Sequence, residues 1–298
     1  MKNKSLINLL NYGDTGCSCN RMYFLYLLDN ELHSCKKIYD DVSVCCYAIE
    51  NKIKCEYFEV SSLRDLREKL KRIEIESKKY KPLIHIEAHG QEKSGIIISK
   101  TAELMSFKEL ITWFRKININ CRNNLQVVLP VCYGYDLYYD LIKLPCVTEA
   151  VPFYYIISSE KEINGIEVEL LTKYYKDLII NSDILKSIKK LREKTKTLVM
   201  NISEILFLSI FESYYLNYKS NKVRQERVEH FITQARLDNK LNKEKLTETR
   251  NEYKKKVKDF SSAFTRYKNS FLLADKPGNE NRFTYTFEDF LNALNENE

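Results

Sequence analysis

The chain has 298 residues, of which 44% are apolar, 30% charged and 12% aromatic, and a formal net charge of +7. At about 150 residues per domain, this length predicts two domains or one large domain with an appendage, and the composition excludes a wholly disordered chain. No apolar run approaches the roughly 18 residues of a membrane-spanning helix, and residues 6–10 are too short for a secretory core. We therefore expect a soluble, unexported protein with no membrane partner.

The cysteines predict a reducing compartment. Their number is odd, no CxxC pair occurs, and a chain of this length has no need of disulfide bonds. We therefore expect free thiols and a cytoplasmic location. The nine cysteines are at positions 17, 19, 35, 45, 46, 55, 121, 132 and 146.

Strand-like and helix-like segments alternate from residue 54 onward. Residues 54–60 have β-type composition, and the serine pair that follows caps a helix whose apolar residues recur at spacings of three and four. Residues 82–88 predict the next strand, which ends at His89 and Gly90. Residues 1–50 give only weak strand and loop signals.

The alternation continues to about residue 200. Ser106 opens a helix with a capping box, and an apolar strand at 125–131 ends at Cys132. Other expected elements are strands at 95–99, 153–158 and 197–201 and helices at 133–142 and 166–178. Strands separated by helices of this length predict an α/β fold, a mainly parallel sheet flanked by helices, within residues 1–200. Residues 201–298 predict a helical C-terminal extension with a regulatory or partner-binding role.

Most of the net charge lies in one part of this extension. Residues 219–260 hold 13 Lys and Arg against 7 Asp and Glu. Such a segment can bind nucleic acid or an acidic protein partner. A solvated helix surface is the simpler interpretation, because aromatic residues are sparse there and no nucleic-acid motif accompanies the charges.

Reactive side chains follow two successive strands of the predicted sheet. One strand ends in His89 and Gly90, the other in Cys132, Tyr133 and Gly134. In an open parallel sheet, functional groups gather beyond the carboxyl ends of the strands. If the two strands are neighbours, the imidazole and the thiol face one cleft.

An imidazole beside a thiol is suited to nucleophilic catalysis. One histidine can deprotonate the thiol and later protonate a departing amine. The backbone N–H groups of Gly90 and Cys132 are candidate donors to a developing oxyanion. A glycine at position 134 would let the chain turn sharply into a helix whose positive end favours a thiolate.

These residues and their order resemble a known family. His-Gly after an apolar strand, a Gly-Ile strand, a helix and then an apolar strand ending in Cys-x-Gly resemble the caspase-like cysteine peptidases, more narrowly the bacterial CHAT-type relatives of separase. Residues 150–178 are similar to the segment that follows the cysteine strand in those proteins. The resemblance covers about residues 55–190.

The resemblance implies a peptidase without a metal or other cofactor. His89 would be the general base and acid, Cys132 the nucleophile, and Gly90 with Cys132 the oxyanion hole. Bacterial members of the family serve antiphage or programmed-death systems, where they cleave a protein partner such as a gasdermin or a toxin component. Because the caspase Gln-Ala-Cys context is missing, selectivity for aspartate is not implied.

Acidic residues near the expected cleft suggest a different selectivity. Asp136 and Glu160 or Glu162 lie where this family builds its substrate pocket, and an acidic pocket would select Arg or Lys before the scissile bond. Solvated surface carboxylates remain the alternative interpretation.

Two rival functions stay open. His85, Glu87 and His89 alternate along a strand and could form a metal site on one face, although nothing else in the sequence supplies a second shell. The chain could instead be a catalytically silent binding module that engages a protein or nucleic acid through residues 219–260. Retention of both His89 and Cys132 favours the enzyme.

Overall fold

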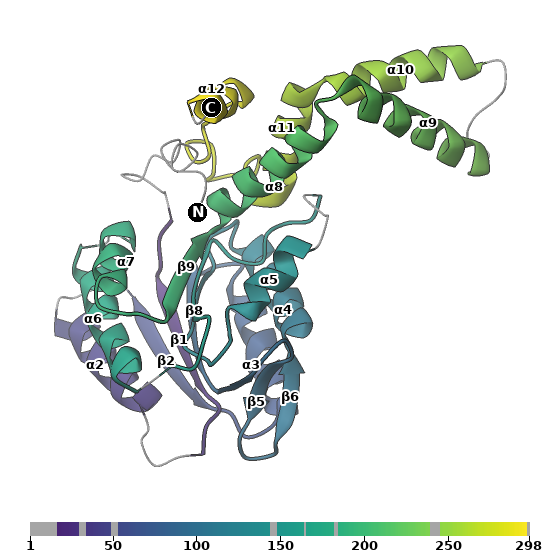
Figure 1. Ribbon diagram of the computed structural model, residues 1–298. Helices are drawn as coiled ribbons and strands as arrows, with labels where there is room; N and C mark the ends of the chain where they lie inside the picture. The colour runs from purple at the N-terminus through teal and green to yellow at the C-terminus, as the bar shows by residue number, and fades with distance from the viewer. Residues whose placement is uncertain are drawn as a thin grey trace.

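The computed structural model describes residues 17–29, 34–48, 53–143, 148–163, 165–181, 184–238 and 245–296. Its centre is a six-stranded sheet in the order β2-β1-β3-β7-β8-β9 (Figure 1). The strands are β1 (Arg21–Tyr26), β2 (Lys54–Glu59), β3 (Pro82–Glu87), β7 (Gln126–Leu129), β8 (Tyr155–Ser159) and β9 (Leu198–Ile202). All pairs are parallel except β8 with β9, so the expectation of a mainly parallel α/β sheet is confirmed.

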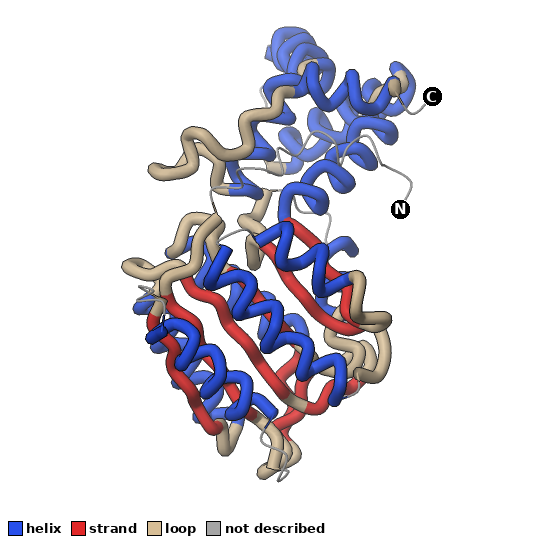
Figure 2. Tube along the Cα trace, turned by 90° about the vertical axis from the view of Figure 1, so that its left-hand side faces the viewer, coloured by secondary structure: helices blue, strands red, loops and turns tan. Residues whose placement is uncertain are grey.

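Helices cover both faces of this sheet. Figure 2 looks from the side of α2, α6 and α7, and Figure 1 shows α3, α4 and α5 on the other side. The bounds are α2 (Ser34–Ala48), α3 (Leu63–Glu76), α4 (Phe107–Asn120), α5 (Asp136–Lys143), α6 (Gly165–Asn181) and α7 (Ile184–Arg192). The central strands are buried almost completely, as expected for a parallel sheet with two covered faces.

Local signals place most of these elements correctly. Ser62 and Ser106 cap α3 and α4 through their side chains, and the apolar stripe of α3 is buried. Residues 1–50 hold more structure than the sequence indicates, because β1 lies between β2 and β3 and α2 packs beside it. Cys146 and residues 6–10 lie outside the described residues.

A second, smaller sheet follows β3. It contains β4 (His89–Gln91), β5 (Gly95–Ile98) and β6 (Glu103–Ser106), all antiparallel. The predicted strand at 82–88 therefore ends at Glu87, and His89 begins a new strand. Because His89 belongs to this second sheet, it lies beyond the carboxyl end of β3 and is exposed, whereas β3 itself is buried.

Three C-terminal helices pack on the sheet domain. They are α8 (Ser203–Tyr218), α11 (Phe260–Leu272) and α12 (Phe287–Asn295). Their aromatic residues Phe207, Phe211, Phe264, Phe271 and Phe290 belong to the same hydrophobic cluster as the sheet. Removal of this part of the extension would therefore expose the core.

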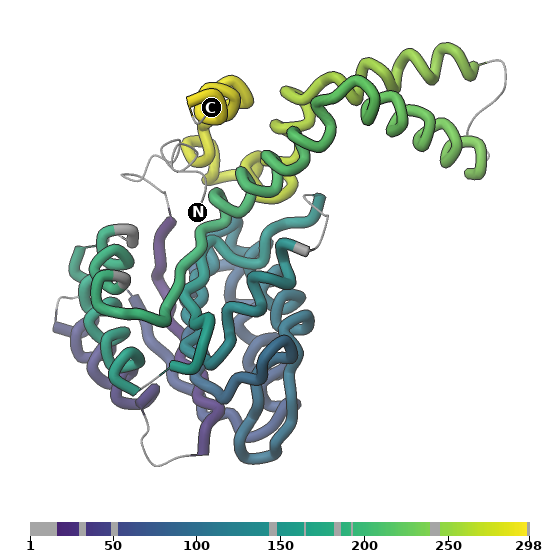
Figure 3. The backbone as a smooth tube through the Cα atoms, in the orientation of Figure 1, coloured from purple at the N-terminus to yellow at the C-terminus, as the bar shows by residue number. Residues whose placement is uncertain are grey.

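Two further helices of the described extension form an arm. Helices α9 (Asn221–Leu237) and α10 (Leu246–Lys258) pair with each other and project away from the body (Figures 1 and 3). They share a small separate cluster of Val228, Ile232 and Val257. This α9–α10 arm contains most of the basic segment.

The C-terminal helices contact the amino ends of the parallel strands. Ser203 N–H donates to the carbonyl of Tyr154, just before β8, over 2.7 Å. Asn123, just before β7, donates from its side chain to the Leu272 carbonyl over 3.0 Å. His89 and Cys132 follow the carboxyl ends, so the described part of the extension packs at the opposite edge of the sheet.

No helix within the described residues is long and apolar enough to cross a bilayer.

The two parts of the extension should differ in their effect on stability. Replacing residues 221–258 with a short Gly/Ser linker should leave a cooperatively folded protein, because the α9–α10 arm has its own cluster and Tyr215 lies only 5.1 Å from Phe260, ring to ring. Truncation after Lys219 removes Phe264 and Phe290 from the core and should abolish cooperative unfolding. Circular dichroism during heating tests both variants, and equal stability of the two would contradict this division.

Candidate active site

The two strands that carry the candidate dyad are neighbours. β3 and β7 pair in parallel, with His85 opposite Val128. His89 follows the end of β3 by two residues, and Cys132 follows the end of β7 by three. The condition that the sequence left open, that these two strands are neighbours, is met.

The main chains beyond these strands touch at Gly90. A Cβ atom added there would collide with the carbonyl oxygen of Cys132 and would lie 2.6 Å from Cγ1 of Val131. Only glycine lets β4 approach this closely to residues 130–135, the loop between β7 and α5 that we call the cysteine loop. The contact places the residue after His89 directly against the backbone of Cys132.

Cys132 opens a tight turn. Tyr133 has a left-handed φ of 57°, which is costly for a residue with a side chain. The N–H groups of Tyr133, Gly134 and Tyr135 donate to carbonyl oxygens. Among the described residues, the N–H of Cys132 donates no hydrogen bond.

Gly134 is needed in this turn for another reason than the sharp change of direction that the sequence suggested. The left-handed residue is Tyr133, whereas the φ of Gly134 lies outside that region. A Cβ atom at Gly134 would lie 2.5 Å from Oγ of Ser158 on β8, so this glycine is needed for close packing against the sheet. No sequence pattern marked Tyr133 as the strained residue.

The two residues of the candidate dyad differ in exposure. His89 is exposed and Cys132 is half-buried. Within the described part of the chain, no hydrogen bond joins the imidazole to the thiol. Catalytic hydrogen bonds are often loose before substrate binds, and rotation of an exposed histidine side chain is fast.

The two acidic residues predicted to bind substrate already have partners. Asp136, at the start of α5, accepts the Lys93 N–H over 2.7 Å and so ties the β4–β5 turn to the cysteine loop. Glu160 is exposed and accepts the Tyr139 hydroxyl over 3.2 Å. Burial, followed by the negative charge of Glu160 and Asp136, raises the pKa of Tyr139, which places all three groups in one region.

The structure contradicts a metal site built from His85, Glu87 and His89. His85 and Glu87 are buried on β3, and their Nε2 and Oε2 atoms are 3.8 Å apart. His89 is exposed on β4, because the chain leaves β3 at Glu87 and the alternation of side chains does not continue. Glu162 is exposed as well.

Neither a search of protein-family models nor a search of curated proteins finds a match to this chain.

The close contact at Gly90 can be tested by a matched pair of glycine substitutions. Gly90→Ala should lower the free energy of unfolding by about 1–3 kcal/mol, because the backbone must shift to admit the methyl group. Gly165→Ala should be neutral or stabilise by up to about 1 kcal/mol, because an added Cβ there meets nothing within 4 Å. Urea unfolding measures both, and equal effects would rule out the contact.

Proposed function

We propose that the chain is a cysteine endopeptidase that uses His89 and Cys132. The observation that supports it best is the contact between Gly90 and the Cys132 carbonyl. It holds the chain after an exposed histidine against the chain of an accessible cysteine, at the edge of the sheet where parallel α/β proteins place their sites.

The chemistry follows from these two side chains. The imidazole of His89 takes the thiol proton, and Sγ of Cys132 attacks the carbonyl carbon of the scissile peptide bond. The resulting oxyanion accepts the N–H of Cys132, and Gly90 is the second candidate donor. His89 then gives its proton to the leaving amine as the C–N bond breaks, and a thioester remains.

Water completes the cycle. His89 takes a proton from the water molecule that attacks the thioester, and the carboxylate product leaves as Cys132 regains its proton. Tyr133, one of seven described non-glycine residues with a positive φ, lies directly after Cys132. Its left-handed conformation is part of the tight turn that follows the proposed nucleophile.

The resemblance to CHAT-type peptidases extends the proposal to a biological setting. The substrate is a specific protein in a bacterial antiphage or programmed-death system, such as a gasdermin or toxin component, and cleavage takes place in the cytoplasm. The free thiols of the described cysteines are compatible with this compartment.

Removal of either member of the dyad should abolish peptide hydrolysis. Cys132→Ala and His89→Ala should each lower kcat by at least about 10³-fold, because nucleophile and base act as a unit. Cys55→Ala is the matched control, since Cys55 is a half-buried thiol on the edge strand β2. Turnover of fluorogenic peptides, or of candidate protein partners, measures the effect.

Alkylation gives a second readout that needs no substrate. Iodoacetamide should label Cys132 more slowly in His89→Ala, while Cys55 serves as the internal reference. Cys121 should resist labelling, because burial raises its pKa to about 12. Unchanged labelling of Cys132 together with unchanged hydrolysis would contradict the dyad.

The proposal includes a pocket that binds a basic residue of the substrate before the scissile bond. Asp136 and Glu160 both lie near Tyr139 and beside the cysteine loop. Each accepts one hydrogen bond, and a carboxylate has further acceptor sites for a guanidinium or ammonium group.

The pocket predicts faster cleavage after Arg or Lys than after Asp or Leu. Asp136→Asn and Glu160→Gln should each lower kcat/KM for the Arg substrate about tenfold, because a charged hydrogen bond contributes about 1.5–3 kcal/mol. The Asn side chain keeps an acceptor for the Lys93 N–H. Glu248→Gln removes the same charge from α10 and should change nothing. Faster turnover of the Asp substrate would exclude an acidic pocket.

The projecting α9–α10 arm favours a second candidate function. A catalytically silent module could bind a protein or nucleic acid through this basic arm. Several of its charges are already paired within the arm, including Arg250 with Glu229 and Lys256 with Glu252. Such a module would lose nothing on Cys132→Ala, which separates the two candidates.

A further inference from the structure

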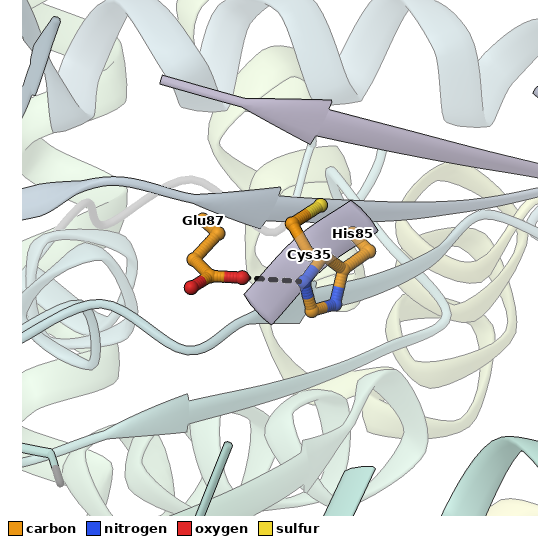
Figure 4. A group of neighbouring side chains, drawn as sticks. All are labelled: Cys35, His85 and Glu87. Carbon is orange, nitrogen blue, oxygen red and sulfur yellow. Dashed lines mark ion pairs between the residues drawn. The ribbon is translucent and has the colours of Figure 1, made fainter. Parts of the chain in front are cut away.

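A buried cluster of potential metal ligands lies on the face of the sheet covered by α2 and α6. Its members are Cys35 from the first turn of α2 and His85 and Glu87 from β3. Their ligand atoms all lie within 4.8 Å of one another, and the three residues are 0%, 0% and 5% exposed. Figure 4 shows the Glu87 carboxylate directed at the His85 ring, with the Cys35 sulfur beside them.

Two atoms of this cluster have no hydrogen-bond partner among the described residues. They are Nε2 of His85 and Oε2 of Glu87. They are 3.8 Å apart, which is within the range of an ion pair (dashed in Figure 4) but too long for a hydrogen bond. Buried polar atoms nearly always have hydrogen-bond partners, so a nitrogen and a carboxylate oxygen that face each other without any are the kind of pair that a bound cation would satisfy.

The other polar atoms of the same side chains are held in place. Nδ1 of His85 lies 2.8 Å from the Tyr175 hydroxyl of α6, and the Ser34 hydroxyl donates to Oε1 of Glu87. An Nδ1–H that donates to Tyr175 leaves the lone pair of Nε2 directed into the cluster. Metal-binding histidines and carboxylates are oriented by outer hydrogen bonds of this kind.

We propose that Cys35, His85 and Glu87 bind one zinc ion. A thiolate, a neutral imidazole and a carboxylate are the donor types that zinc selects, and the two negative charges match Zn²⁺. On binding, the Cys35 thiol loses its proton to solvent. A water molecule or another donor completes the tetrahedron.

The observed spacing suits zinc after small adjustments. Zinc bonds of about 2.0–2.1 Å to nitrogen and oxygen and about 2.3 Å to sulfur place tetrahedral ligand atoms about 3.3–3.6 Å apart. Side-chain rotations that move the ligand atoms by about 1 Å bring them to these separations. The ion would then join α2 to the centre of the sheet, just before the chain passes from β3 to His89.

Zinc content tests the site directly. The full-length protein, purified without chelators, should contain about one zinc ion per chain by mass spectrometry of the metal. Cys35→Ser, His85→Gln and Glu87→Gln should lose it. Cys121→Ser, a buried cysteine outside the cluster, and Cys132→Ala should retain it, which separates this site from the proposed dyad.

Cobalt substitution shows whether a thiolate binds the metal. It is measured on the wild-type protein, so the result does not depend on the folding of a ligand variant. The wild-type protein loaded with Co²⁺ should show a thiolate-to-cobalt charge-transfer band, and Cys132→Ala should show the same band. A chelator should lower the Tm of the wild-type protein, because an ion that binds only the native state stabilises it. Wild-type protein without zinc, or zinc retained by a folded Cys35→Ser variant, would overturn the proposal. A band lost in Cys132→Ala would do so too.

Discussion

The approach of Gly90 to the carbonyl of Cys132 is the constraint on which the proposed site depends. β3 and β7 are adjacent in the sheet, but adjacency alone leaves the loops beyond the strands free to diverge. The glycine lets the β4 strand lie against the cysteine loop, and the Lys93 N–H to Asp136 hydrogen bond fastens the next turn to α5. These two contacts hold the strand that begins at His89 against the turn that begins at Cys132, and the left-handed Tyr133 lies within that turn.

The helical extension stands at the other end of the sheet. Helices α8 and α11 contact the chain just before β7 and β8, and the Arg282 guanidinium donates to the carbonyl of Asn123. The described part of the extension therefore does not cover the edge that carries His89. If the extension regulates the site, its influence must pass through the sheet. One route is β9, which runs antiparallel to β8, from the carboxyl ends of the parallel strands to their amino ends. The α9–α10 arm, with its own small core, is the part best suited to meet a partner without disturbing the fold.

Much of the fold could be predicted from local signals, because caps and apolar periodicity are encoded within one segment. Ser62 and Ser106 mark helix starts that the structure reproduces. The signals failed where pairing is non-local: β1 is an interior strand of the sheet, yet residues 1–50 gave only weak strand and loop signals. The order of residues also placed His89 and Cys132 after two successive strands, and these strands are neighbours in the sheet. It could not show the left-handed Tyr133, the link from Asp136 to Lys93, or Cys35 beside His85, because those depend on how distant segments pack.

The most direct test of the account is a crystal structure of the protein after reaction with a peptide aldehyde, whose thiohemiacetal resembles the tetrahedral intermediate. The account predicts a covalent bond to Sγ of Cys132, with the aldehyde oxygen accepting the Cys132 N–H. It also predicts the His89 imidazole turned toward the sulfur, and the Gly90 main chain beside them. An adduct on another cysteine, or an imidazole that points away from a modified Cys132, would contradict the peptidase assignment.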